Sequence, residues 1–114
     1  MAIQTTTQKN TVATAYGTAA THGALYTTAP GASAGTEVTG GSPAYARKAL
    51  SWGAASGGVI SVTVTFDVPS GTTVVGAGVH TAISAGTYLD GASVTSQAFA
   101  SQGTYQVTFT YTQT

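Results

Sequence analysis

The fold is decided by residues 59–66, which read Val-Ile-Ser-Val-Thr-Val-Thr-Phe. Apolar side chains occupy every even position of this stretch, namely Ile60, Val62, Val64 and Phe66. Serine or threonine occupies each odd position after Val59. Because successive side chains of a strand point to opposite faces, the pattern predicts a strand with one buried face and one face of hydroxyls.

The same alternation returns near the end of the chain, at residues 105–112, which read Tyr-Gln-Val-Thr-Phe-Thr-Tyr-Thr. Further strands are expected at residues 22–28, 45–52, 72–83 and 92–99, with turn residues between them. About six strands at roughly ten-residue spacing are typical of an antiparallel β-sandwich. The sequence therefore predicts a mainly β protein.

Two details of these strands can be tested. In residues 72–83 the apolar face is expected to carry Val75, Ala77, Val79, Thr81 and Ile83. Gly76 and Gly78 lie on the other face, which predicts a bulky group over bare backbone, with Trp52 and Tyr88 as candidates.

Asp67 and Asp90 precede turn-forming residues, so we expect both to be turn formers.

The segment before the first strand has a different pattern. Residues 5–17 place apolar side chains at helical spacing behind threonines that can cap a helix, and Gly17 can end it. A short helix is expected here, or else an extended arm that reaches a neighbouring subunit. We expect an N-terminal helix or arm at residues 1–20 and a sandwich domain at 21–114. The long loop at 29–43 is the best candidate for a binding surface.

Charge is scarce, because only six of the 114 residues are Lys, Arg, Asp or Glu and they sum to zero. A small soluble domain normally keeps a net charge, so this composition favours a fixed part of an assembly. Three basic residues argue against nucleic acid as a main partner. The chain contains no apolar run long enough to span a membrane, and residues 1–9 lack the order of a secretory signal. We therefore expect no membrane partner and no export by a signal of the chain's own.

A catalytic or metal site is not expected. Cysteine is absent, which excludes thiolate chemistry and sulfur-ligated zinc. The candidate acids and bases sit in separate segments: Glu37, Asp67, Asp90, His22 and His80. We therefore expect no enzyme activity and no cofactor, with structural roles for the two histidines.

The densest unusual stretch is residues 40–52, Gly-Gly-Ser-Pro-Ala-Tyr-Ala-Arg-Lys-Ala-Leu-Ser-Trp. It combines an aromatic residue, the only adjacent basic pair and the only tryptophan, and such residue types anchor protein interfaces. The candidate docking residues are Tyr45, Arg47, Lys48 and Trp52, together with Glu37 from the preceding loop. The alternative is that Tyr45 and Trp52 are core aromatics and Arg47 is solvated.

This stretch, with residues 25–31 before it and 66–74 after it, resembles small virion proteins of tailed actinobacterial phages and prophages. Such proteins are described as tail-fibre, minor tail or decoration proteins. The resemblance covers residues 22–110 and implies a virion structural part, on the capsid surface or the tail, that is made in the host cytoplasm and has no catalysis. The expected partners are the major capsid protein or other virion proteins, together with further copies of this chain.

Among virion roles, a decoration protein on the outer capsid surface is the first expectation, because the chain is too short for a fibre shaft. A tail-associated protein is the alternative. The third possibility is a carbohydrate-binding module. Tyr45 and Trp52 on an open platform would favour it, and burial of their rings would disfavour it.

Overall fold

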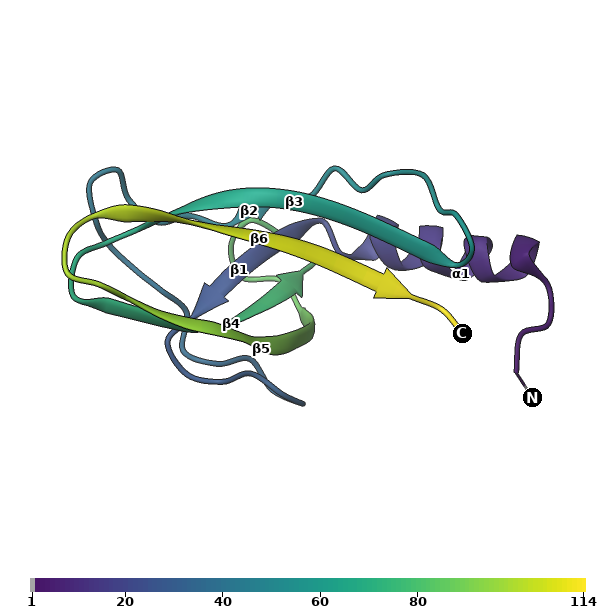
Figure 1. Cartoon of the computed structure of the whole chain (residues 1–114), viewed down its shortest axis with the longest axis horizontal. Coiled ribbons are helices and arrows are strands. Elements are labelled where there is room, and N and C mark those ends of the chain that lie inside the picture. The colour runs from purple at the N-terminus through teal and green to yellow at the C-terminus, as the bar shows by residue number, and fades with distance from the viewer. Residues whose placement is uncertain (1) are drawn as a thin grey trace.

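The computed structural model describes residues 2–114 and contains one helix and six strands. The elements are α1 (Thr6–Ala19), β1 (His22–Tyr26), β2 (Lys48–Ala49), β3 (Val59–Val68), β4 (Thr72–His80), β5 (Tyr88–Phe99) and β6 (Gly103–Thr112). The strands form two antiparallel sheets, one in the order β2-β1-β4-β5 and one made of β3 and β6 (Figure 1). The prediction of an antiparallel sandwich with a short N-terminal helix is confirmed.

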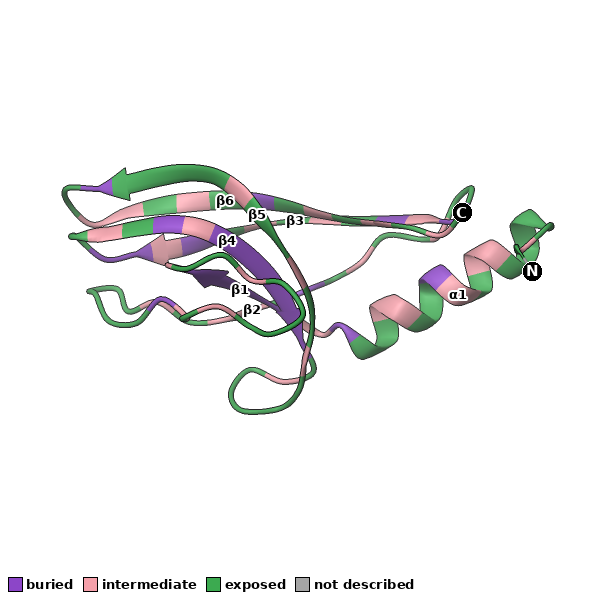
Figure 2. Cartoon of the chain, turned by 90° about the horizontal axis from the view of Figure 1, so that it is seen from below, coloured by how far each residue is buried: buried purple, intermediate pink, exposed green. Residues whose placement is uncertain are grey.

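The sheet of β3 and β6 is paired without interruption from Val59 opposite Thr112 to Val68 opposite Gly103. Ile60 and Phe66 are buried, as the alternation predicted: Phe66 in the core between the sheets and Ile60 against Gly17 of α1. In Figure 2 buried positions lie mostly on β1 and β4, in the other sheet, while β5 is exposed along most of its length. The apolar core therefore lies between β3–β6 and the central strands of the four-stranded sheet.

Strand β4 is shorter than predicted, and its first inward-facing valine differs from the one predicted. It ends at His80, and residues 81–87 form a loop. A register shift lies between Val74 and Gly76, so Val74, not Val75, is the buried residue. Ala77 and Val79, which follow the bulge, are buried as predicted. The bulge moves one residue out of the alternation, which is why a strict period of two placed Val75 instead of Val74 on the inward face.

The glycines of β4 do lie beneath bulky groups, but not the expected ones. A Cβ built on Gly78 would stand 2.7 Å from the hydroxyl of Tyr26, and one on Gly76 would collide with Pro30. Tyr88 instead covers Gly91, with its hydroxyl 2.5 Å from where a Cβ would be. The outer face of this sheet is therefore covered by the segment after β1.

Two turn predictions were wrong. Asp90 lies inside β5, a single twelve-residue strand, and its Oδ1 accepts from the backbone N–H of Gly91 at 2.9 Å. Asp67 lies inside β3 opposite Thr104, one residue before the strand ends. In both cases strand pairing prevails over a local preference of aspartate for turns.

The predicted strand over residues 45–52 is reduced to the two residues of β2. Part of the preceding loop lines the edge of β1 instead. Val38 donates its N–H to the carbonyl of Leu25 at 3.1 Å, and Glu37 forms an isolated bridge with Tyr26. The loop at 29–43 is therefore tied to the sheet at its middle.

The predicted N-terminal helix is confirmed as α1, which is capped by the side chain of Thr5, accepting from the N–H of Gln8 at 3.2 Å. Tyr16 stacks on Tyr111 of β6 with ring centroids 4.0 Å apart. The side-chain oxygen of Asn10 accepts from the N–H of Gly58 at 2.8 Å.

Helix α1 extends the molecule to 48 × 25 × 23 Å, and the two chain ends lie at this same end (Figure 1). Among residues 2–114, no helix has the length and apolar character needed to cross a bilayer.

Candidate docking surface

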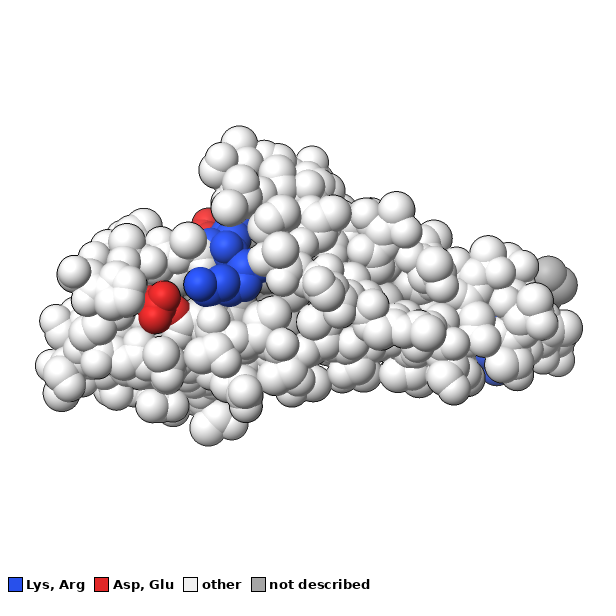
Figure 3. All heavy atoms as spheres, turned by 90° about the horizontal axis from the view of Figure 1, so that it is seen from above, with Lys and Arg blue, Asp and Glu red and all other residues white. Residues whose placement is uncertain are grey.

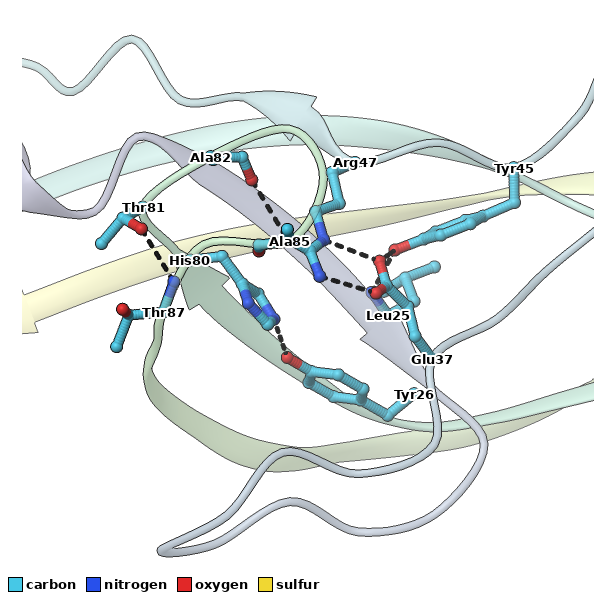
Figure 4. A network of polar contacts seen from close by, with 10 residues as sticks. All are labelled: Leu25, Tyr26, Glu37, Tyr45, Arg47, His80, Thr81, Ala82, Ala85 and Thr87. Atoms are coloured by element: carbon cyan, nitrogen blue, oxygen red, sulfur yellow. Dashed lines mark hydrogen bonds and ion pairs between the residues drawn. The ribbon is translucent and has the colours of Figure 1, made fainter.

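The structure brings together three of the five predicted docking residues, Glu37, Tyr45 and Arg47. Figure 4 shows their side chains meeting beside β1, with Glu37 at the centre. Arg47 donates from Nη2 to Oε1 of Glu37 at 2.9 Å and from Nε to Oε2 at 3.0 Å. Tyr45 donates its hydroxyl to the same Oε2 at 2.7 Å. These residues form a compact polar cluster, which we call the Glu37 network.

The surroundings of this network favour an ionised carboxylate. Although burial opposes ionisation, the hydrogen bonds from Arg47 and Tyr45 lower the pKa of Glu37 below its ordinary value. Burial raises the pKa of Tyr45, so its hydroxyl stays protonated and able to donate. The same hydroxyl accepts from the N–H of Leu25 at 3.0 Å, which ties the network to β1. Arg47 is therefore an internal ion-pair partner and not a solvated side chain.

Arg47 also fixes the loop between β4 and β5. Its Nη1 donates to the carbonyls of Ala82 and Ala85 at 3.0 and 2.9 Å (Figure 4). Ala85 has a φ of 52°, a left-handed conformation that non-glycine residues seldom adopt. The loop presents Ile83, whose exposed fraction of 61% is the largest among the big apolar residues. We call residues 81–87 the Ile83 loop.

A hollow of about 380 Å³ lies between the Glu37 network and the Ile83 loop. Its lining includes Tyr45, Arg47 and Ile83. An exposed isoleucine beside a rigid hollow is suited to contact with another protein surface.

Lys48 and Trp52 lie apart from this network. Lys48 is half-exposed, with its Nζ 3.9 Å from Oδ2 of Asp67. Trp52 donates its indole N–H to the carbonyl of Ala20 at 2.8 Å and packs edge-on against Tyr16. Tyr45 stacks on buried Phe66, with ring centroids 6.2 Å apart. Tyr45 and Trp52 therefore do not form the shared open platform that a sugar-binding module would use.

His80 is buried on the outer face of the four-stranded sheet, where its Nε2 makes a short hydrogen bond with the hydroxyl of Tyr26. Burial and the nearby Arg47 charge lower the pKa of His80. No group of three His, Asp or Glu side chains within residues 2–114 is arranged to bind a metal ion. The buried position of His80 agrees with a structural role, and the Nδ1 of His22 lies 3.0 Å from the hydroxyl of the adjacent Thr21.

A second candidate surface is the outer face of β3 and β6. Its cross-strand pairs include Thr63 with Thr108, whose hydroxyl oxygens are 2.9 Å apart, and Ser61 with Thr110, at 3.3 Å. We call this the hydroxyl face, defined by Ser61, Thr63, Thr65, Gln106, Thr108 and Thr110, which are all exposed. It is an extended, uncharged polar surface.

Charged atoms are correspondingly rare on the surface shown in Figure 3, and most of the visible ones lie close together. Their grouping reflects the two ion pairs, Glu37 with Arg47 and Asp67 with Lys48.

Sequence reasoning missed the Ile83 loop because Ile83 continues the alternation of the preceding strand. The available signal was the run Ser84-Ala85-Gly86, which favours a loop. The contacts from Arg47 that order this loop span 35 residues or more, so no local pattern reveals them.

Comparison with known proteins matches residues 2–113 to the family described as "Podophage GP4 fiber I protein gp80". No curated protein and no solved structure shows a match. The family match spans almost the whole chain, and the fold agrees with the virion structural role that the sequence resemblance implied. The chain therefore belongs to the podophage GP4 fiber I protein family and is a structural protein of a phage virion.

Proposed function

We propose that this chain is a fibre-associated structural subunit of the phage tail. The observation that carries the proposal is the family match over residues 2–113, because the family description names a fibre protein. The elongated shape is suited to a part that contacts neighbours along its length. Capsid decoration was our first expectation from the sequence, but neither the family description nor the structure favours it over a tail location.

The proposed partners are other virion proteins and further copies of this chain. Two surfaces support such contacts: the Ile83 loop, with a large apolar side chain exposed, and the hydroxyl face, with no charge to desolvate. No nucleic acid or membrane partner is proposed. An actinobacterial host stays a prediction, since the family description names none.

The proposed role involves no catalysis. Glu37 is engaged by Arg47 and Tyr45, and His80 is buried against Tyr26, so neither is poised to act on a substrate. Asp67 faces Lys48. The separation of these groups supports a role in assembly only.

The location can be tested on purified virions by electron microscopy with an antibody against this chain. We expect label on the tail. Label distributed over the capsid lattice would instead establish the decoration role, and virions without the protein would overturn both.

The docking surfaces can be tested with variants assembled into the same particles. Ile83→Ser and Thr108→Lys should each lower the copy number per virion, measured by quantitative mass spectrometry. Ser101→Lys, at an exposed position of the turn between β5 and β6, is the control and should assemble normally. Full occupancy of both surface variants would exclude these surfaces as contacts.

A further inference from the structure

Four of the six charged side chains form two ion pairs. Glu37 pairs with Arg47, and Asp67 faces Lys48. Within residues 2–114, Lys9 and Asp90 form no ion pair. The protein therefore presents one unpaired side chain of each sign.

Asp90 lies beside a pocket that suits a cation. The pocket has a volume of about 200 Å³, and its lining includes Tyr16, Trp52, Phe109 and Asp90. Oδ2 of Asp90 accepts from the Tyr16 hydroxyl at 3.3 Å, and Oδ1 accepts from the N–H of Gly91. Both donors are neutral, so the carboxylate charge is not compensated. Aromatic rings beside a carboxylate are suited to an ammonium group.

The pocket exists because small residues face it. At this level Ala77 of β4 and Ala92 of β5 put only methyl groups into the space between the sheets, and the backbone of Gly78 and Gly91 completes this wall. On the other side the lining comes from β6, including Val107 and Phe109. The space lies between β5 and β6, which are each the last strand of their sheet, so the pocket opens at an edge of the sandwich.

Lys9 cannot fill the pocket of its own chain. It lies seven residues before Tyr16 on α1, which is about 10.5 Å along a helix axis. Helical side chains tilt toward the N-terminus, so the Lys9 side chain points away from Tyr16 and Asp90. Its Cβ packs against Gly58. Among the described residues its ammonium has neither a hydrogen-bond acceptor nor an acidic partner.

We propose that Lys9 of one copy inserts its ammonium into the Asp90 pocket of a second copy. The two charges are complementary, and an uncharged protein surface offers them no other partner within the described chain. The proposal rests on the proposed role in assembly and names one contact between copies. Tyr16, Trp52 and Phe109 surround the ammonium, and Asp90 neutralises it.

The test measures self-association of the full chain by sedimentation velocity. Lys9→Gln and Asp90→Asn should each weaken association by about 10-fold, the effect of a partly desolvated cation–aromatic and ionic contact. Asp90→Asn keeps an oxygen for Tyr16, so the fold is preserved. The reversed pair, Lys9→Asp with Asp90→Lys, should restore association. Added salt should weaken the wild-type contact.

A matched control reverses the internal pair, with Lys48→Asp and Asp67→Lys, and should leave association unchanged. Circular dichroism checks that each variant is folded. Three results would each overturn the proposal: a wild-type monomer at about 0.1 mM, where even a contact weaker than micromolar is detectable; single variants that associate normally; or a folded reversed pair that fails to recover. The tail location is measured separately on virions, so each proposal can fail without the other.

Discussion

Arg47 and Glu37 are joined by two parallel hydrogen bonds, and the remaining nitrogen of the same guanidinium binds the carbonyls of Ala82 and Ala85. One side chain thus connects the segment before β2 to the loop between β4 and β5. The fork of five donors in arginine makes this possible, and a lysine at the same position could not reproduce it.

Replacing Arg47 tests how much this connection contributes to the free energy of unfolding. Arg47→Ala leaves the half-buried Glu37 carboxylate without its cation and should lower the free energy of unfolding by about 2 to 4 kcal/mol. Urea denaturation measures the change. Hydrogen exchange should also show faster exchange in residues 81–87.

Lys48→Ala is the matched control, because its pair with Asp67 is long and exposed. It should cost less than about 0.5 kcal/mol. Equal effects of the two substitutions would contradict a special role for Arg47.

The Glu37 network predicts a defined response to acid. The pKa of Glu37 is lower in the folded chain than in the unfolded chain, because Arg47 and Tyr45 donate to its carboxylate despite the cost of burial. The unfolded chain therefore binds more protons in acid. The contribution of Glu37 to stability is complete above the ordinary carboxyl value of about 4.3 and is lost as the pH falls through the lowered value.

Glu37→Gln should remove this part of the pH dependence. Urea midpoints of wild type and variant, compared between about pH 6 and pH 2, should converge as the pH falls. Parallel curves over the whole range would show that the pKa of Glu37 is the same in the folded and unfolded chains, against this prediction.

A substitution of Gly78 tests the close packing on the outer face of the four-stranded sheet. A methyl group on Gly78 would stand 2.7 Å from the Tyr26 hydroxyl, which also bonds buried His80. Gly78→Ala should therefore destabilise the fold by about 1 to 3 kcal/mol. Gly31→Ala, with open space around it, is the control and should change stability little in thermal unfolding.

Substitutions of Tyr16 test which contacts attach α1 to the β-sandwich. Its ring stacks on Tyr111 and contacts the edge of Trp52, and burial, with the Asp90 carboxylate, raises its pKa to about 12. Tyr16→Ala should loosen the helix, cost about 3 kcal/mol and shift the fluorescence of the single tryptophan to the red. Tyr16→Phe keeps the stack and should preserve the spectrum. An unchanged spectrum in the alanine variant would show that other contacts anchor α1.

The sheet of β3 and β6 could be predicted closely from sequence because each strand alternates strictly between apolar and hydroxyl side chains. The helix was predictable from its threonine cap and its apolar spacing. The length of β5 was not, because Asp90-Gly91 has the composition of a turn, and only pairing with β4 shows it to be strand.

The candidate site was predictable in its residues but not in their arrangement. The residue types singled out Glu37, Tyr45 and Arg47, which the structure brings together, and also Lys48 and Trp52, which lie apart from them; the docking role of all five stays a prediction. Their contacts to each other, and to carbonyls far along the chain, depend on the packing of β1 against β4. The bulge at Val74 likewise follows from the tertiary structure and has no local sequence signal.

The threonine and serine pairs across β3 and β6 make the charge of the hydroxyl face independent of pH. None of their hydroxyl groups, nor the amide of Gln106, gains or loses a proton in the range that living systems or natural waters reach. A protein contact made through this face would keep the same affinity in acidic and in neutral surroundings. Any response to pH must then reside in the few ionic groups, of which Asp67, paired with Lys48, lies at the end of this face, two residues after Thr65.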